Sequence, residues 1–280
     1  MSAHRTSCEP PIDIVIPCHE KDASVLSRVI DGARRNIVHP IRTIIVVAPE
    51  SRKIRSTCRR LGCEYVLEGL AAPLPRRDVN CNVNGSDRGG WIYQQLIKLS
   101  ADGISNSDYI LVLDADTVLI QPHAFRKRGR TVLFVTAGYH GPYLDAYARL
   151  LALPSLGNTS FISHYMLLER HKLARLRDAI QAVTKQPWYV AILATADATV
   201  STSFFSEYET YGNFCLFNFA DEFLLERSDN LSLPPSWMAT LPLVALAGRM
   251  RSVSLHHHTK NERRRAVLER LLRSCVGGEA

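Results

Sequence analysis

Two aspartates directly after a strongly apolar segment are the residues of this sequence best suited to chemistry. Asp114 and Asp116 flank one alanine and follow the run YILVL at positions 109–113. In open α/β sheets, ligands bind beyond the carboxyl ends of the strands, where such a strand would deliver both carboxylates. Two carboxylates this close repel each other unless a cation lies between them, and Mg²⁺ or Mn²⁺ prefers oxygen ligands. The pair therefore predicts a divalent metal site; the alternative is a pair of aspartates that only cap a turn.

A second polar group shares one face of a helix that we expect over 91–100. Trp91, Gln94, Gln95 and Lys98 have the i, i+3, i+4, i+7 spacing that places side chains on one side. A core stripe would carry Leu or Ile at these positions. An aromatic ring, two amides and a cation instead favour a ligand-binding face, although a partly solvated face with a packed tryptophan remains the alternative.

The segment Ser206-Glu207-Tyr208-Glu209 contains the pattern of a capping box. In this motif the serine caps a helix and the glutamate three residues later reaches back to it. The motif gives Glu209 a structural explanation and leaves Glu207 free for chemistry in the first helical turn. Alternatively, both glutamates only complement the helix dipole.

Histidines add further candidates. His164 follows an apolar run, where a lone histidine is either a core residue or a functional one. His256, His257 and His258 end the apolar segment 241–255. If that segment is extended, His256 and His258 share one face, and either could complete a metal site because imidazole accepts Mn²⁺. A solvated polar cluster is the alternative.

These candidates require a scaffold that brings distant segments together. Strands are expected at 12–17, 41–48, 64–67 and 109–114. Helices are expected at 22–35, 50–61, 91–100, 142–153, 169–184, 206–217 and 260–274. Asp22 is the expected N-cap of the first helix. Strands that alternate with helices predict an α/β fold with a mostly parallel central sheet. The segment between Leu67 and Trp91 is rich in Pro, Gly, Asn and Asp, so we expect a long functional or mobile loop there.

The composition is that of a globular protein. Of the 280 residues, 46% are hydrophobic and 22% charged, which excludes disorder and low-complexity repeats. The net charge of +7 suits phosphate-rich ligands, nucleic acid or an anionic membrane surface, or is only a solubility charge. The cations are scattered without interleaved aromatic residues, so nucleic acid is not an expected partner. Seven cysteines without a CxxC pair argue against a disulfide framework or a zinc ribbon and indicate reduced thiols.

The distribution of apolar residues predicts a cytoplasmic location. Residues 1–11 carry no long apolar run, so no signal peptide is expected. No stretch of about twenty uncharged apolar residues occurs, so no membrane span is expected either. Residues 260–273 have the pattern of a basic amphipathic helix. It is either an ordinary surface helix or a peripheral contact with the inner face of the cell membrane.

Several strings in order along the chain resemble the GT-A glycosyltransferases. IDIVIPCHEKD at 12–22 is similar to their opening strand and nucleotide-binding turn, and LDADTVL at 113–119 to their DxD motif. More narrowly, three strings together resemble the DUF6492-type bacterial glycosyltransferases: GWIYQQLIKL at 90–99, SFISHYM at 160–166 and SEYETYGNF at 206–214. The resemblance implies a GT-A (Rossmann-like) fold and transfer of a sugar from a nucleotide sugar, often in surface polysaccharide assembly.

The resemblance also suggests roles for the candidates. Asp114 and Asp116, with His256 or His258, would hold Mn²⁺ or Mg²⁺. The donor, with a UDP-sugar favoured, would lie against Pro17, His19, Glu20, Trp91, Gln94, Gln95, Lys98 and Asp114. The acceptor would be a glycan or a lipid-linked molecule next to His164. In an inverting enzyme a carboxylate deprotonates the acceptor hydroxyl, and Glu207 is the first candidate for this base, with Glu209 second.

We expect one domain over residues 1–280. Its nucleotide-binding half would span about 10–125 and its acceptor-binding half about 126–258, followed by the basic helix at about 260–274. The loop at 68–90 would close over the donor and exclude water, because hydrolysis competes with transfer.

Two other functions fit parts of the sequence. DADTVL at 114–119 satisfies the pattern DxDx[TV][LV] of haloacid-dehalogenase-type phosphatases, in which Asp114 would be the nucleophile. Three strand-like segments precede it here, whereas that motif normally opens the fold, and the later acidic motif has only Asp221-Glu222 as a candidate. A non-enzymatic nucleotide- or glycan-binding module is the third hypothesis, against which the intact pair of aspartates argues.

Overall fold

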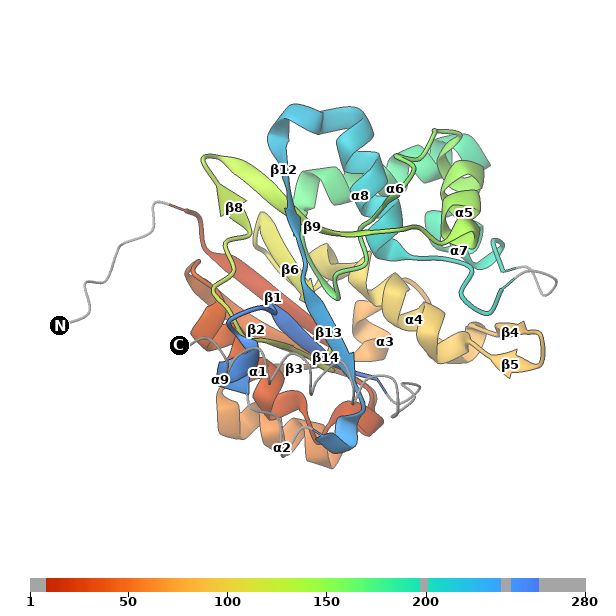
Figure 1. Ribbon diagram of the computed structural model, residues 1–280. Coiled ribbons are helices and arrows are strands. Elements are labelled where there is room, and N and C mark those ends of the chain that lie inside the picture. The colour runs from red at the N-terminus through yellow and green to blue at the C-terminus, as the bar shows by residue number, and fades with distance from the viewer. Residues whose placement is uncertain (1–8, 197–200, 238–242, 257–280) are drawn as a thin grey trace.

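The computed structural model describes residues 9–196, 201–237 and 243–256 (Figure 1). The expectations for His257, His258 and the helix at 260–274 lie outside these ranges. The strands are β1 (Ile12–Pro17), β2 (Ile41–Ala48), β3 (Glu64–Leu67), β4 (Asn82–Val83), β5 (Ser86–Asp87), β6 (Tyr109–Leu113), β7 (Thr117–Leu119), β8 (Arg126–Lys127), β9 (Arg130–Ala137), β10 (Thr159–Ser160), β11 (Tyr165–Glu169), β12 (Phe223–Arg227), β13 (Asn230–Leu233) and β14 (Ser252–Leu255). The helices are α1 (Leu26–Asn36), α2 (Arg52–Leu61), α3 (Glu68–Ala71), α4 (Gly89–Lys98), α5 (Gly141–Leu151), α6 (Arg170–Thr184), α7 (Trp188–Leu193), α8 (Glu207–Phe219) and α9 (Leu243–Leu246).

A five-stranded sheet in the order β11-β6-β1-β2-β3 forms the centre of the molecule. β6, β1, β2 and β3 are parallel, and β11 is antiparallel to β6. Alternate residues of β1 enter two cores: Ile14 and Ile16 pack with α1 and α2 on one face, and Val15 packs with α4 on the other. Because both faces are covered, the sheet interior reads as continuous apolar runs. The mostly parallel α/β fold expected from the sequence is confirmed.

The second half of the chain extends this sheet and covers one side of it. Figure 1 shows α5, α6, α7 and α8 gathered on one side, away from α1 and α2. A three-stranded sheet in the order β13-β14-β7 brings the end of the described chain back to β7, the strand that directly follows Asp116. His256, which directly follows β14, therefore lies near the carboxyl end of β6.

Two local expectations were wrong. Helix α1 begins at Leu26 and not at Asp22, because Glu20–Asp22 forms a separate 3-10 turn and the N-cap position is Val25. The segment expected as a long loop holds α3, a 3-10 turn at Arg76–Asp78 and the β4–β5 hairpin. In the described part of the apolar segment before His256, α9 precedes β14, and the four residues next to His256 are extended. Short turns and two-residue strands carry too little periodicity to be recognised in a sequence.

No helix in the described ranges combines the length and the apolar character needed to cross a membrane.

Gly212 on α8 allows an unusually close approach between this helix and the segment before β11. A Cβ at this position would lie 2.4 Å from Cγ of Phe161, which is fully buried. We predict that Gly212→Ala lowers the free energy of unfolding by about 1–3 kcal/mol through overpacking, measured by urea denaturation. Gly69→Ala is the matched control, because Gly69 lies on α3 and a Cβ added there would meet no atom within 4 Å. Equal stability of both variants would contradict this packing.

Candidate active site

The carboxylate of Asp114 is held by three side chains from different parts of the chain. Its Oδ1 accepts from Lys98 Nζ of α4 at 2.5 Å and from the Tyr208 hydroxyl of α8 at 3.0 Å, and its Oδ2 lies 3.1 Å from His164 Nδ1. Burial alone would raise the pKa of Asp114, but the Lys98 ammonium and His164 hold it well below its ordinary range. Asp114 is therefore an ionised carboxylate in a half-buried position.

Strand pairing places His164 beside Asp114. β11 is antiparallel to β6 with Tyr165 opposite Leu113, so the next residues along, His164 and Asp114, also face each other. The backbone N–H of Asp114 donates to the His164 carbonyl at 2.9 Å. His164 has φ +68°, a left-handed conformation that costs a non-glycine residue energy and that often marks functional sites.

Lys98 joins Asp114 to Glu207. Its ammonium donates to Glu207 Oε1 at 2.6 Å and lies 3.2 Å from the Tyr208 hydroxyl oxygen. One helical turn earlier, Gln95 Oε1 accepts from the backbone N–H of Glu207 at 3.1 Å. The predicted shared face of α4 thus presents Gln95 and Lys98 to the start of α8. Burial raises the pKa of Glu207 and Asp114 adds to the effect, whereas the Lys98 ammonium opposes it.

Asp116 lacks such a cation and faces His256. The register of β14 on β7 pairs Ser254 with Thr117, and the Leu255 N–H donates to the Asp116 carbonyl at 2.8 Å. This register brings His256 Nε2 to 3.9 Å from Asp116 Oδ2. Burial and the negative charge of Asp114 raise the pKa of Asp116 to about 7. A carboxylate that is costly to ionise next to an imidazole is a donor pair to which a divalent cation would bring compensating charge.

A metal at this position fits the described residues in part. Asp116 and His256 offer an oxygen and a nitrogen ligand, and the imidazole rings of His164 and His256 lie 4.9 Å apart. Asp114 faces Lys98 and His164 instead of a shared centre. Mn²⁺ or Mg²⁺ would accept this incomplete set, because both commonly take further ligands from water and phosphates.

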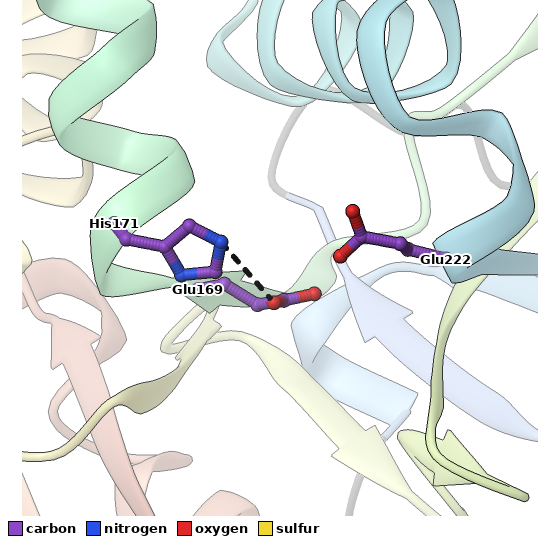
Figure 2. Close-up of side chains that lie close together, drawn as sticks. All are labelled: Glu169, His171 and Glu222. Carbon is purple, nitrogen blue, oxygen red and sulfur yellow. Dashed lines mark ion pairs between the residues drawn. The ribbon is translucent and has the colours of Figure 1, made fainter.

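Another acidic cluster lies outside this site. In the described ranges, the only three His, Cys, Asp or Glu ligand atoms within 4.8 Å of one another belong to Glu169, His171 and Glu222 (Figure 2). Lys172 already lies between the two carboxylates, with Nζ 2.5 Å from Glu169 Oε2 and 2.8 Å from Glu222 Oε2. The cluster is an ion-pair network in which an ammonium occupies the place that a metal would take.

The capping box at the start of α8 is formed only in part. Ser206 caps α8 as predicted, since its Oγ accepts from the Glu209 N–H at 3.2 Å. The Glu209 carboxylate does not reach back to the cap. Its Oε1 accepts instead from Ser160 Oγ at 2.5 Å and from the Phe161 N–H at 3.2 Å. The close packing of α8 on this segment places those donors within reach, so hydrogen bonds to Glu209 connect α8 to the segment before β11.

The other predicted donor-site residues lie at the edge of the sheet or along α4. Pro17 is buried at the end of β1, and His19 and Glu20 are exposed just beyond it. Glu20 Oε1 accepts from Ser51 Oγ at 3.2 Å. Gln94 is half-buried on α4.

Trp91 lies at the outer part of α4. Its ring is edge-on to Phe204, with centroids 5.2 Å apart, and carries the guanidinium of Arg88 at 4.2 Å. Sequence reasoning missed Arg88 and Tyr208, although Tyr208 lies inside the string at 206–214 that already pointed to function. Arg88 precedes the first residue of α4, where no spacing rule marks it.

Asp114 and Asp116 thus follow the carboxyl end of β6, with Lys98 of α4 beside them, which is where open α/β sheets bind their ligands. Residues 10–175 match the family described as Glycosyltransferase like family 2, which is well over half of the chain. The chain therefore belongs to this family. It is a nucleotide-sugar-dependent glycosyltransferase with the GT-A fold. This assignment decides against the phosphatase and the non-enzymatic module.

Several solved structures of glycosyltransferases match the chain. Mouse xyloside xylosyltransferase 1 in its apo form is 12% identical, with a TM-score of 0.45 over 90% of this chain and 99% of that chain. Galactosyltransferase LgtC in complex with donor and acceptor sugar analogues is 13% identical, with a TM-score of 0.45 over 94% and 95%. Glucosyl-3-phosphoglycerate synthase from Mycobacterium tuberculosis in complex with Mn²⁺, UDP and glucosyl-3-phosphoglycerate is 13% identical, with a TM-score of 0.40 over 95% and 78%. No curated protein matches the chain.

The raised pKa of Asp116 predicts a pH dependence of the metal-free stability. In the folded protein Asp116 keeps its proton up to about pH 7, whereas an unfolded aspartate releases it near pH 4. The stability that this group contributes is therefore present below about pH 4 and is lost as the pH rises through about 7. In EDTA, we expect Asp116→Asn to gain stability relative to the wild type between about pH 5 and about pH 8, measured by urea denaturation. Parallel pH profiles of the two proteins would contradict the assignment.

Proposed function

We propose that the protein transfers a sugar from a UDP-sugar in a reaction that depends on Mn²⁺ or Mg²⁺ at the Asp114–Asp116 motif. The observation that carries this proposal is the convergence of α4, the turn before β11 and the start of α8 on Asp114, through Lys98, His164 and Tyr208. A metal bound there would neutralise the diphosphate of the leaving nucleotide.

We assign different roles to the residues around the motif. Asp116 and His256 would hold the metal, with His258 as the further candidate from the sequence. Lys98 and His164 would fix the position of Asp114, and His164 would also lie next to the acceptor, as the resemblance implies. The nucleotide and its sugar would lie along Pro17, His19, Glu20, Trp91, Gln94 and Gln95.

Glu207 is the better candidate for the general base if transfer inverts the anomeric configuration. Its carboxylate lies with Lys98 beside Asp114, whereas the Glu209 carboxylate is engaged by Ser160 and Phe161. The raised pKa of Glu207 favours proton transfer, because a base works best when its pKa lies near the working pH.

The remaining parts of the proposal concern the acceptor. We infer one domain, with the nucleotide bound in residues of about 10–125 and the acceptor in residues of about 126–258. The acceptor would be a glycan or a lipid-linked molecule in bacterial surface polysaccharide synthesis, and a peripheral membrane contact would deliver a lipid-linked one. The narrower likeness to DUF6492-type enzymes is supported by the three strings at 90–99, 160–166 and 206–214, which contribute Lys98, His164, Glu207 and Tyr208 to one cluster.

A thermal-shift panel tests the donor and the metal. Purified protein is heated with UDP, GDP, CMP or their sugar conjugates, each in Mn²⁺, Mg²⁺ or EDTA. A ligand at a hundred times its dissociation constant raises the free energy of unfolding by about 2.7 kcal/mol. We expect UDP or a UDP-sugar to stabilise the wild type only with metal, and Asp116→Ala to lose this shift. Stabilisation by UDP that is equal in EDTA, or unchanged in Asp116→Ala, would rule out the metal site.

The two glutamates give a matched kinetic comparison. Glu207→Gln should lower kcat by about 10²–10⁴-fold, because proton transfer is lost. It should also lower the melting temperature, because Lys98 loses one of its two carboxylate partners. Glu209→Gln should mainly lower the melting temperature, because its carboxylate accepts hydrogen bonds inside the core. Retention of wild-type kcat in Glu207→Gln would exclude it as the base.

A further inference from the structure

Arg88 is a half-buried arginine without a charged partner. Its Nε is sealed from solvent and has no hydrogen-bond acceptor, and in the part of the chain that the structure describes no carboxylate forms an ion pair with its guanidinium. The contact with the face of Trp91 stabilises the positive charge but offers no acceptor for its N–H donors. Burial accordingly lowers the pKa of Arg88. A buried donor left unpaired in this way needs an explanation, and a missing ligand is one.

Arg88 belongs to the same row as the site residues of α4. Arg88, Trp91, Gln95 and Lys98 follow one another at intervals of three, four and three residues, so they run along one side of the helix. The row begins at Lys98, against Asp114 and Glu207, and ends at Arg88 about 15 Å further out at 1.5 Å per residue. An acceptor that extends from Glu207 to Arg88 would therefore pass beside the donor that we place along Trp91 and Gln95.

Tyr143 on α5 interacts electrostatically with Arg88 at one end of this row and with Glu207 at the other end. Burial raises the pKa of its hydroxyl and a hydrogen bond with Ser203 opposes this; Glu207 raises the pKa further, whereas Arg88 lowers it. The hydroxyl is therefore within electrostatic reach of both Glu207 and Arg88. Phe204, which follows Ser203, packs on Trp91. Tyr143 and Phe204, which belong to the acceptor-binding half that we infer, thus lie near the row, and this favours the acceptor as the ligand of Arg88.

The nearest acid in the sequence does not neutralise Arg88. Asp87 uses its Oδ1 to accept from the Gly89 N–H at 2.8 Å, where it caps the start of α4. Arg76, the other arginine near this point, donates to the Val79 carbonyl at 2.9 Å and lies over the Tyr93 ring. The Arg76 guanidinium lies against Gly89, so a second arginine is close to the start of α4.

We propose that Arg88 binds an oxyanion, a phosphate or a carboxylate, carried by the acceptor. A planar guanidinium that is stacked on an aromatic ring is well suited to grip such a group with two parallel hydrogen bonds. The inference rests on the proposed function, because it assigns Arg88 to the acceptor of that reaction. It narrows the acceptor to an anionic molecule, either a phosphate-linked one or an acidic sugar.

Calorimetric titration with two small probes tests the proposal. Inorganic phosphate and D-glucuronate are titrated into the wild type, Arg88→Gln, Arg88→Lys and Arg77→Gln, first alone and then with UDP and Mg²⁺ present to fill the donor site. Arg77 is a matched control for net charge, since its side chain is 85% exposed. We expect binding of at least one probe to be about tenfold weaker in Arg88→Gln, partly restored in Arg88→Lys and unchanged in Arg77→Gln, as loss of a bidentate pair requires. The probe that binds distinguishes a phosphate from a carboxylate.

Three outcomes would overturn the proposal. The first is that neither probe binds the wild type, and the second is that both probes bind Arg88→Gln as tightly as the wild type. The third is that Arg88→Gln loses UDP binding while Arg77→Gln keeps it, which would assign Arg88 to the donor. Failure of UDP to bind any of the four proteins contradicts the proposed function alone, because the titrations without UDP still test Arg88. Arg88→Lys keeps the positive charge, so it controls for a loss of folding that the removal of this charge could cause in Arg88→Gln.

Discussion

The site depends on one buried ammonium group. Lys98 is only 6% exposed and lies between the carboxylates of Asp114 and Glu207, at 2.5 and 2.6 Å. An ammonium cannot stay charged in such a place without both partners, and leaving a buried charge unpaired costs about 3–5 kcal/mol. The interaction therefore fixes α4, the end of β6 and the start of α8 relative to one another, although 109 residues separate Lys98 from Glu207. It connects the nucleotide-binding and the acceptor-binding halves that we infer.

The two aspartates differ in pKa because the pairing with Lys98 compensates the charge of Asp114 only. Lys98 and His164 compensate Asp114, so its charge persists and acts on its neighbour. Burial and, after it, the negative charge of Asp114 raise the pKa of Asp116 to about 7, whereas Asp114 stays ionised. The protein compensates the charge of only one of the two carboxylates, and we infer that a metal cation compensates the other. The return of β14 beside β7 adds the imidazole of His256 at the same point. This asymmetry gives a physical reason for a metal at Asp116, and it does not depend on the resemblance between sequences.

Much of the scaffold could be predicted from the sequence. The strands at 12–17, 41–48 and 64–67 have the expected bounds. The first two lie inside the sheet and leave apolar runs because both of their faces are covered, whereas β3 is a short edge strand with exposed ends. The spacing on α4 correctly grouped Gln95 with Lys98. The partners of Lys98 could not be predicted, since they come from a strand register and a helix far along the chain. The same limit applies to Glu209: the capping-box pattern is local, but the carboxylate is drawn away by Ser160 and Phe161, which only tertiary packing brings near. Arg88 was missed because what marks it is the lack of a partner, and a sequence does not display that.

The most direct test of the account is anomalous diffraction from crystals grown with Mn²⁺ and UDP. The account predicts a manganese peak within bonding distance of the Asp116 carboxylate and of the UDP diphosphate, with His256 as a further ligand and Lys98 still between Asp114 and Glu207. A peak at Glu169, His171 and Glu222 without one at Asp116, or UDP bound away from the carboxyl end of β6, would contradict it.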